Sequence, residues 1–490
     1  MSFFFESYSA MVIGEILLAP RNGELSIEAI ASKLNIALES LTPFFEQLEQ
    51  MGIVSSVLPT DEIIADYRKR VSEYNCQQQQ SLELTTQEKL PYAISNAEKL
   101  YTEKVGGITS VMFELTYRCS EKCIHCYNEG ATRNDEEVST RGDRVELTLD
   151  EYKRLIDELY DQGIMKVCLT GGDPFSKSFA WELIDFLYNK GIAFDVFTNG
   201  QRIVDEVERL ANYYPRLVGV SIYSGIPEVH DYITRIQGSW EHSMSVVRQL
   251  SALGVPMNLK CCVMRPNVKS YFMVADIAKK YGAVPQFEIS LTDSVEGDKC
   301  VSKYLRMTPE QLEIVLRDDN VALYVGKEAP NYGGQPKPMD QNPCGAGDNS
   351  FCITPEGNLI PCCSFHTLFG NIKEQSISNI IVKSKELAYW RGMKLSDYEE
   401  CGRYDYCSYC NLCPGNNFIE HGTPLKASEV NCYMAKTRYN LAKKMMNGYD
   451  PLNGKTQRDR LAELPDFAPV EIKREMSLNN YSETKLKVGG

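Results

Sequence analysis

The chain has 490 residues, of which 43% are hydrophobic and 24% charged, and its formal net charge is -14. That length accommodates about two to four domains, and the acidic balance argues against a general nucleic-acid-binding protein. No apolar run approaches the ~20 residues of a membrane span. The N-terminus lacks the basic segment of a signal peptide, so we expect a cytoplasmic protein whose 17 cysteines are metal ligands rather than disulfides.

Residues 1–75 are predicted to form a small helical module. Apolar periodicity indicates three helices and then a strand, over Ala10–Leu18, Ser26–Leu34, Leu38–Met51 and Ile53–Leu58. This order is the outline of a winged helix. DNA binding is one use for such a module, but the third helix carries Glu39, Glu46 and Glu49, which phosphates would repel. A purely structural cap is another.

A polar connector follows the helical module. Residues 59–105 include four consecutive glutamines, Gln77–Gln80, and a short helix is expected over Asp61–Glu73. Residues 76–105 are therefore predicted to be a linker.

Three cysteines come directly after an apolar segment, Ser110–Leu115, that is predicted to be a strand. Cys119, Cys123 and Cys126 form a C-x3-C-x2-C run. Three thiolates on one tight loop can hold three irons of a [4Fe-4S] cube and leave the fourth iron open to a small molecule. A zinc knuckle is the plainer alternative, but structural zinc usually takes four ligands and only His125 lies nearby. The spacing favours an iron–sulfur cluster.

From Thr109 onward, strands and helices alternate. Six strands are predicted, over Ser110–Leu115, Lys166–Leu169, Ala193–Thr198, Val218–Ile222, Met257–Val263 and Gln286–Ser290. One helix between them is expected to begin at a capping box formed by Thr148 and Glu151. The other helices are expected over Phe179–Lys190, Glu206–Tyr213, Glu241–Leu253 and Val268–Tyr281. Alternation of this kind indicates an α/β fold with a parallel sheet, and six units predict a partial (β/α)6 TIM-like barrel over residues 106–325. Sites in such folds gather at the C-terminal ends of the strands.

A second motif ends the second predicted strand, where Gly171, Gly172 and Asp173 precede a proline. Alone, this motif is typical of a surface turn. Together with the cysteine run, it resembles the radical S-adenosylmethionine (SAM) enzymes. The resemblance implies that SAM chelates the open iron and that one electron cleaves it to a 5'-deoxyadenosyl radical, which abstracts a hydrogen atom. It also implies a low-potential electron donor of the flavodoxin or ferredoxin type.

The same resemblance assigns SAM contacts to the two motifs. Gly171, Gly172 and Asp173 would receive the methionyl ammonium, because glycines without a Cβ let the backbone approach a ligand. Asp173 stands where the family more commonly has Glu. His125, just before the third cysteine, would contact adenine.

Five further polar residues lie near later strand ends. Asn199 and Ser221 occupy positions at which the family binds the ribose or carboxylate of SAM, and Arg235 could pair with that carboxylate. Each of the three could equally satisfy local backbone groups. Asp293 and Glu296 follow the sixth strand. They are candidates for a catalytic acid or base, with a solvated loop as the alternative.

Not every cysteine is expected to bind metal. Cys168, Cys261 and Cys262 alternate into predicted strands and are interpreted as small core hydrophobes.

Nine cysteines gather in residues 326–450, at Cys344, Cys352, Cys362, Cys363, Cys401, Cys407, Cys410, Cys413 and Cys432. The turn residues at Pro355–Asn358 predict a hairpin between Phe351–Thr354 and Leu359–Cys362. The Gly357-x4-Cys362 spacing after Cys344 resembles the SPASM domain, which implies two auxiliary [4Fe-4S] clusters, three clusters in all. Residues 451–490 are predicted to be a polar tail, disordered or loosely docked.

Two closed cubes need eight thiolates. The family's order assigns the first auxiliary cluster Cys344, Cys352, Cys362 and Cys413. It assigns the second Cys401, Cys407, Cys410 and Cys432, which leaves Cys363 spare. The usual C-x2-C-x5-C-x3-C run is C-x5-C-x2-C-x2-C here, so the partition stays open. Cys352 could be the spare thiol instead, opening the first cluster to a substrate thiolate, and a zinc ribbon at Cys407/Cys410 is the plainer alternative.

The combination predicts an enzyme that modifies a ribosomally made precursor peptide. Residues 1–75 would capture the leader of that peptide as an added strand. Enzymes with this layout most often form a thioether from a cysteine sulfur to a carbon of another residue. A formylglycine-forming maturase and a carbon–carbon crosslinking enzyme are alternatives. A redox sensor whose winged helix reads DNA belongs to another class, but a sensor needs no SAM site.

Overall fold

The structure is a computed structural model that describes residues 26–50, 108–127, 146–293, 301–321 and 338–468, together with a few single residues between 12 and 69. Several predictions lie outside the described residues, among them most of Ala10–Leu18 and Ile53–Leu58, the linker 76–105 and Glu296. Within the described ranges, no helix is long and apolar enough to cross a membrane.

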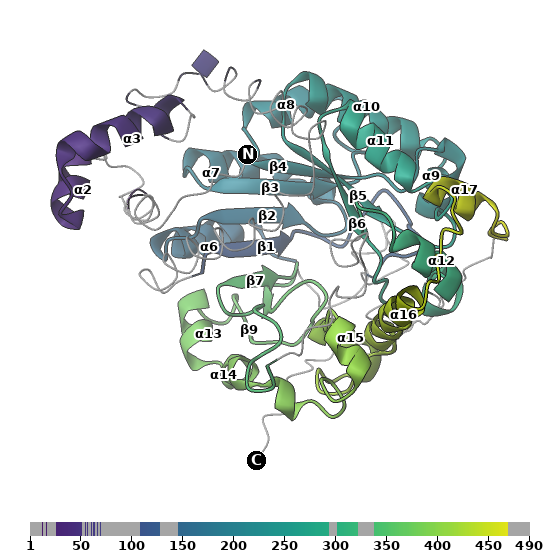
Figure 1. The fold of residues 1–490 in the computed structure, drawn as a ribbon. Coiled ribbons are helices and arrows are strands. Elements are labelled where there is room, and N and C mark those ends of the chain that lie inside the picture. The colour runs from purple at the N-terminus through teal and green to yellow at the C-terminus, as the bar shows by residue number, and fades with distance from the viewer. Residues whose placement is uncertain are drawn as a thin grey trace.

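Six parallel strands form the larger part of one curved sheet (Figure 1). They are β1 (Ser110–Glu114), β2 (Lys166–Thr170), β3 (Ala193–Thr198), β4 (Leu217–Ser221), β5 (Met257–Cys262) and β6 (Val284–Glu288). Their order is β6-β5-β4-β3-β2-β1, as expected for an α/β fold with a parallel sheet. β6 begins two residues before the predicted range. Pro285 is tolerated there because an outer strand needs no N–H donor on its free side.

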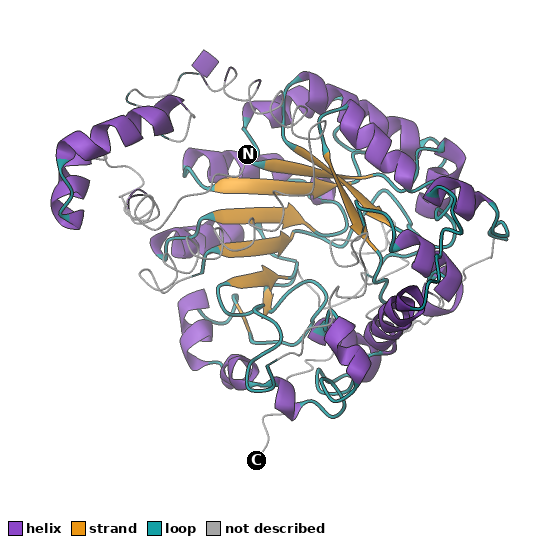
Figure 2. Ribbon diagram, in the orientation of Figure 1, coloured by secondary structure: helices purple, strands orange, loops and turns teal. Residues whose placement is uncertain are grey.

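Helices cover the outer face of this sheet (Figure 2). They are α6 (Leu149–Asp161), α7 (Ala180–Asn189), α8 (Val207–Asn212), α9 (Pro227–Thr234), α10 (Ser239–Ala252) and α11 (Phe272–Lys280), with a short 3-10 turn η3 at Pro174–Ser176. The capping box of Thr148 and Glu151 is confirmed at the start of α6. The sequence did not predict α9, which begins at a proline and is only two turns long.

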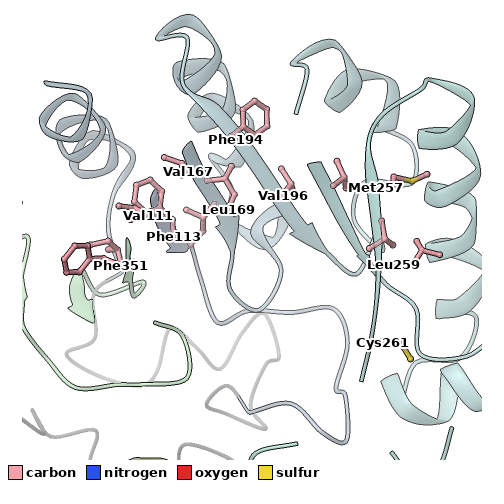
Figure 3. Close-up of a cluster of buried hydrophobic side chains, with 14 of the residues drawn as sticks. Val111, Phe113, Val167, Leu169, Phe194, Val196, Met257, Leu259, Cys261 and Phe351 are labelled. Carbon is pink, nitrogen blue, oxygen red and sulfur yellow. The ribbon is translucent and has the colours of Figure 1, made fainter. Parts of the chain in front are cut away.

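Alternate strand residues form the core between sheet and helices. Figure 3 shows the outward-pointing set, which includes Val111, Phe113, Val167, Leu169, Phe194, Val196, Met257, Leu259 and Cys261. Since side chains alternate along a strand, the residues between them face the interior of the curved sheet. Cys261 and Cys168 are buried, as predicted, although Cys168 falls on an interior-facing position. Cys262 also faces the interior and packs, partly buried, against a second apolar cluster that includes Tyr223 and Met264.

The C-terminal region continues the sheet rather than forming a separate one. β7 (Ser350–Ile353) and β8 (Asn358–Ile360) make the predicted antiparallel hairpin, and β9 (Gly370–Asn371) pairs with β8. β7 also pairs in parallel with β1, with Cys352 opposite Met112. The sheet therefore has nine strands and crosses the boundary expected near residue 325.

Further helices lie before and after the hairpin in the chain. They are η4 (Val301–Leu305), α12 (Pro309–Val315), α13 (Ile377–Lys383), α14 (Lys385–Gly392), η6 (Leu395–Asp397), η7 (Asp405–Tyr409), α15 (Pro414–His421), α16 (Glu429–Met446) and α17 (Gln457–Ala462). The expectation of a loose tail from residue 451 is wrong as far as residue 468. Leu461 of α17 is fully buried, and the Lys269 ammonium lies 2.7 Å from the Asp466 carboxylate.

Two helices of the N-terminal module are described, α2 (Ile27–Leu34) and α3 (Leu38–Gln50). Ile30, Leu41 and Phe45 form a small apolar cluster between them, which Val12 joins. The winged helix itself stays a prediction, because the expected strand lies outside the described residues.

Candidate functional site

The cysteine loop, residues 115–127, lies at the C-terminal end of β1 and is held from two sides. On one side, the N–H groups of Lys122 and Ile124 donate to the carbonyls of Thr234 and Ile233, each at 2.9 Å. These acceptors belong to the last turn of α9, whose carbonyls have no partner within the helix. The helix that the sequence missed therefore fixes the loop, and Arg235 follows it in a left-handed conformation.

On the other side, the Gly-Gly-Asp segment packs against the same loop. The Gly172 N–H donates to the Thr116 carbonyl at 2.6 Å, and the Asp173 N–H donates to the Arg118 carbonyl at 2.9 Å. A Cβ on Gly172 would lie 2.3 Å from the Arg118 oxygen, and one on Gly171 would lie 2.3 Å from the Thr116 oxygen. The close approach that these glycines allow is thus to the cysteine loop, a reason that the sequence did not reveal.

The Asp173 carboxylate is fully buried and takes three protein donors. It accepts from the Phe175 N–H at 3.0 Å, the Thr198 hydroxyl at 2.6 Å and the Asn199 N–H at 3.0 Å. Burial raises the pKa of this carboxyl above its ordinary value, against the effect of the donors. The carboxylate therefore fixes the end of β3, and its contact with the SAM ammonium stays a prediction.

Asn199 connects this carboxylate to the cysteine loop. Its side-chain amide donates to the Cys119 sulfur at 3.3 Å and to the Ser120 hydroxyl at 3.4 Å. Its backbone N–H is the donor to Asp173. The sequence assigned Asn199 to the ribose or carboxylate of SAM, whereas the structure places its amide on a thiol of the predicted cluster.

Glu121 is a buried carboxyl group that the sequence analysis missed, although it stands between two cysteines of the motif. The Cys123 thiol donates to it at 3.3 Å and the Gln201 amide donates at 3.2 Å. Burial raises the pKa of Glu121 to about 8. The ring of His125 contacts the Tyr223 ring edge-on, with 4.7 Å between centroids.

The other predicted SAM and catalytic residues are placed as follows. Ser221 ends β4 and lies in register with Lys260 of β5. Asp293 is buried beyond β6 and does not lie in a solvated loop. The roles of Ser221, Arg235 and Asp293 stay predictions, as does that of Glu296 outside the described residues.

A pocket between η7 and α16 is lined by four cysteines. They are the set predicted for the second auxiliary cluster, Cys401, Cys407, Cys410 and Cys432. Burial raises the pKa of Cys401 to about 12, so this thiol needs a metal partner to lose its proton. Among the described residues, no three His, Cys, Asp or Glu side chains are close enough to hold a single metal ion. A [4Fe-4S] cluster binds each thiolate at a different iron, so its cysteine ligands lie farther apart than the ligands of a single metal ion.

The four cysteines predicted for the first auxiliary cluster differ in their charged neighbours. Cys344, Cys362 and Cys413 are electrostatic neighbours, since Cys413 and Cys344 both act on the Cys362 thiol. Cys352 is buried on β7, where Glu114 acts on it most strongly and Cys363 and Cys362 act on it as well. Cys363, which the sequence left spare, is also the strongest charged neighbour of Cys362. The partition of these five thiols, including the alternative in which Cys352 is spare, therefore stays a prediction.

Glu114 is a second buried carboxyl group that the sequence did not single out. It ends β1 on an interior-facing position, and the Tyr117 hydroxyl donates to it at 3.5 Å. Burial, with a contribution from Glu356, raises the pKa of Glu114 to about 8. Its position after an apolar strand and before the cysteine run was the available signal.

Comparison with known families agrees with this geometry. The radical SAM superfamily profile matches residues 113–271, and the profile of the SPASM iron–sulfur cluster-binding domain matches residues 344–414. This chain is a radical SAM enzyme with a SPASM domain. Such an enzyme binds SAM and [4Fe-4S] clusters, and the three-thiol loop and the four-thiol pocket fit those groups.

Relatives of this radical SAM enzyme differ in what their names describe. The chain is 28% identical over 317 residues to the antilisterial bacteriocin subtilosin biosynthesis protein AlbA of Bacillus subtilis. That alignment covers 62% of this chain and 66% of the relative. The chain is 25% identical over 338 residues to an AdoMet-dependent heme synthase of Methanosarcina barkeri, covering 62% and 90%. The solved structure of anSMEcpe with bound AdoMet shares the fold, with a TM-score of 0.50, 14% identity and coverage of 70% and 98%.

Proposed function

We propose that this radical SAM enzyme modifies a ribosomally made precursor peptide and forms a thioether between a cysteine sulfur and a carbon of another residue. The observation that carries the proposal is the pairing of two thiol sites on one continuous sheet. The three-thiol loop follows β1, and the hairpin that begins the SPASM domain adds to the same strand. The similarity to a bacteriocin biosynthesis protein supports a peptide substrate.

The chain's own residues position and shield the reaction. When bound, SAM and its cluster would supply the radical chemistry that removes a hydrogen atom from a substrate carbon. Cys119, Cys123 and Cys126 would hold that cluster, while Asp173 and Asn199 keep the loop in place. The enzyme's task would be to hold the substrate C–H bond near the reactive carbon and to keep water and competing hydrogen donors away from it.

The N-terminal helices would recognise the leader of the peptide. Glu39, Glu46 and Glu49 are exposed on α3. An acidic face of this kind suits a basic leader segment and repels nucleic acid, so we favour leader recognition over DNA binding. A low-potential flavodoxin or ferredoxin would be the electron donor.

Two other outcomes of the same radical chemistry compete with the thioether. A formylglycine-type maturase would convert a cysteine or serine to an aldehyde, and a crosslinking enzyme would join two carbons. The heme synthase among the relatives shows that similarity at this level does not decide the substrate. The family assignment itself favours an enzyme over the DNA-reading redox sensor.

The first test is anaerobic reconstitution with iron counting, followed by addition of SAM and dithionite and chromatography for 5'-deoxyadenosine. We expect about twelve irons in the wild type and about eight after Cys119, Cys123 and Cys126 are all changed to Ala, with loss of 5'-deoxyadenosine. Absence of 5'-deoxyadenosine from the reconstituted wild type would contradict the proposed activity.

The bond formed is tested by producing the enzyme together with candidate Cys-containing peptides. A thioether removes one hydrogen from sulfur and one from carbon, so the product loses two hydrogen atoms and one alkylatable thiol per bond. A carbon–carbon crosslink would lose the same mass but keep the thiol. An aldehyde that reacts with hydrazide would indicate formylglycine.

A further inference from the structure

Lys260 is a cationic residue that projects into the interior of the curved sheet. Leu259 and Cys261, its neighbours on β5, both belong to the core that faces the helices (Figure 3). Because side chains alternate along a strand, Lys260 lies on the opposite, interior face. It is two residues from the C-terminal end of β5, on the side of the sheet where the cysteine loop lies.

Two residues on neighbouring strands hold the Lys260 side chain in one place. Its Nζ lies 3.2 Å from the centroid of the Phe197 ring, a cation–π contact with β3. Gly219 of β4, which is in register with Phe197, leaves the space that this contact needs. A Cβ on Gly219 would lie 2.8 Å from both the Lys260 Cε and the Phe197 ring. Three adjacent strands therefore position one ammonium group.

Among the described groups around this ammonium, Asp195 is the one carboxylate, and it forms its ion pair with another residue. Its electrostatic neighbours are Cys168, Cys262, Cys363 and Asp195. Burial raises the pKa of the Cys168 and Cys262 thiols to about 12, so both are neutral near pH 7. The Asp195 carboxylate is paired with Arg216. Within the part of the chain that the structure describes, no ion pair involves Lys260.

A partly buried cation without an ion-pair partner is unfavourable, and proteins normally pair such a charge. Here the space next to the charge is the interior in which the substrate is expected to react. At neutral pH, the anionic groups of a peptide are carboxylates, since a cysteine thiol is mostly protonated. A substrate carboxylate would therefore supply the missing partner.

We propose that Lys260 anchors a carboxylate of the substrate peptide, from an Asp or Glu side chain or the C-terminus, close to the residue that is modified. This inference rests on the proposed function and narrows the substrate class to peptides with an acidic group near the reacting position. The carboxylate of SAM is the other source of the same chemistry, and the test separates the two.

The test uses the reconstituted, SAM-loaded enzyme and a displayed library of short random peptides. Peptides are selected on the wild type and counter-selected on Lys260→Met, which keeps the chain length but removes the charge. The Lys280→Met variant is the matched control, because Lys280 is exposed on α11 and also lies over a tyrosine ring. Lys260→Arg keeps the charge and checks that the interior still accepts a long side chain.

We expect the selected peptides to share an acidic residue at one position and to bind Lys260→Met at least about tenfold more weakly than the wild type. Lys280→Met should bind them as the wild type does, and Lys260→Arg should recover most of the affinity. The Kd for SAM should be unchanged in Lys260→Met. Selected peptides without a shared acidic residue, equal binding to Lys260→Met, or no Lys260-dependent peptide at all would overturn the proposal.

A weaker Kd for SAM in Lys260→Met, with peptide binding unchanged, would also overturn it and assign the ammonium to SAM. The proposed function is judged by a different measurement, the change in peptide mass after turnover. Selected acidic peptides that bind through Lys260 but are never modified would retain this inference for binding and count against the peptide-modifying function.

Discussion

The cysteine loop and the SPASM pocket both gather thiols, but they are built in different ways. The loop carries Cys119, Cys123 and Cys126 within eight residues of one segment, fixed by backbone hydrogen bonds with the Gly-Gly-Asp segment and with α9. The pocket draws three thiols from residues 401–410 and the fourth, Cys432, from the first turn of α16.

The difference shows where each site is vulnerable. The loop depends on close backbone packing, since Gly172 leaves no room for a Cβ beside Arg118. The pocket depends on the packing of η7 against α16. A change to the loop's surroundings should therefore disturb its cluster without touching any thiol, whereas the pocket should be sensitive to the thiols themselves.

The largest effect is expected from removing two thiols of the pocket. The double variant Cys407→Ala/Cys432→Ala should lose about four irons, because a cube left with two thiolates is not retained. The formation of 5'-deoxyadenosine with dithionite should continue, since the cysteine loop is intact. Iron counting and chromatography measure both.

The control for that variant is Cys262→Ala, a thiol on an interior-facing position of β5 that is assigned to no cluster. It should keep the full iron content. Unchanged iron in the double variant would show that the cysteines of the second cluster are wrongly assigned.

A smaller effect is expected from Gly172→Ala, which tests the packing of the loop. The new Cβ would meet the Arg118 oxygen at 2.3 Å, so either the loop or the Gly-Gly-Asp segment must shift. We expect a loss of about 1–3 kcal/mol in the free energy of unfolding, together with a lower iron content. Denaturant titration and iron counting measure the two effects.

Gly392→Ala provides the comparison, because a Cβ there meets nothing within 4 Å. Wild-type iron and stability in Gly172→Ala would indicate that the loop does not need this close contact.

The smallest effect is expected from Asn199→Ala, which removes the N–H donor to the Cys119 sulfur but keeps the backbone bond to Asp173. Hydrogen bonds to the sulfurs of a cluster stabilise its reduced, more negative state. The midpoint potential of the SAM-binding cluster should therefore become more negative. A redox titration followed by electron paramagnetic resonance, with and without SAM, measures it.

Asn212→Ala, on the exposed end of α8, is the matched control. If Asn199→Ala left the potential unchanged but weakened the binding of SAM, the original assignment of this residue to SAM would be preferred.

The sequence by itself determined the local features of this protein. The cysteine spacing, the Gly-Gly-Asp motif and the alternation of strands and helices depend on neighbouring residues, so they can be read along the chain. The capping box of α6 and the β7–β8 hairpin could also be predicted from the sequence, because the capping and turn residues favour these conformations locally.

Only the tertiary structure decided how distant segments meet. The pairing of β7 with β1, the hold of α9 on the cysteine loop and the amide of Asn199 on Cys119 join residues far apart in the chain. No local pattern encodes such meetings, because they follow from strand register and from the packing of whole elements. Lys260 is an example. Its sequence position shows only a lysine within an apolar strand, whereas the structure places Phe197 and Gly219 beside it and so suggests the proposed carboxylate-binding role.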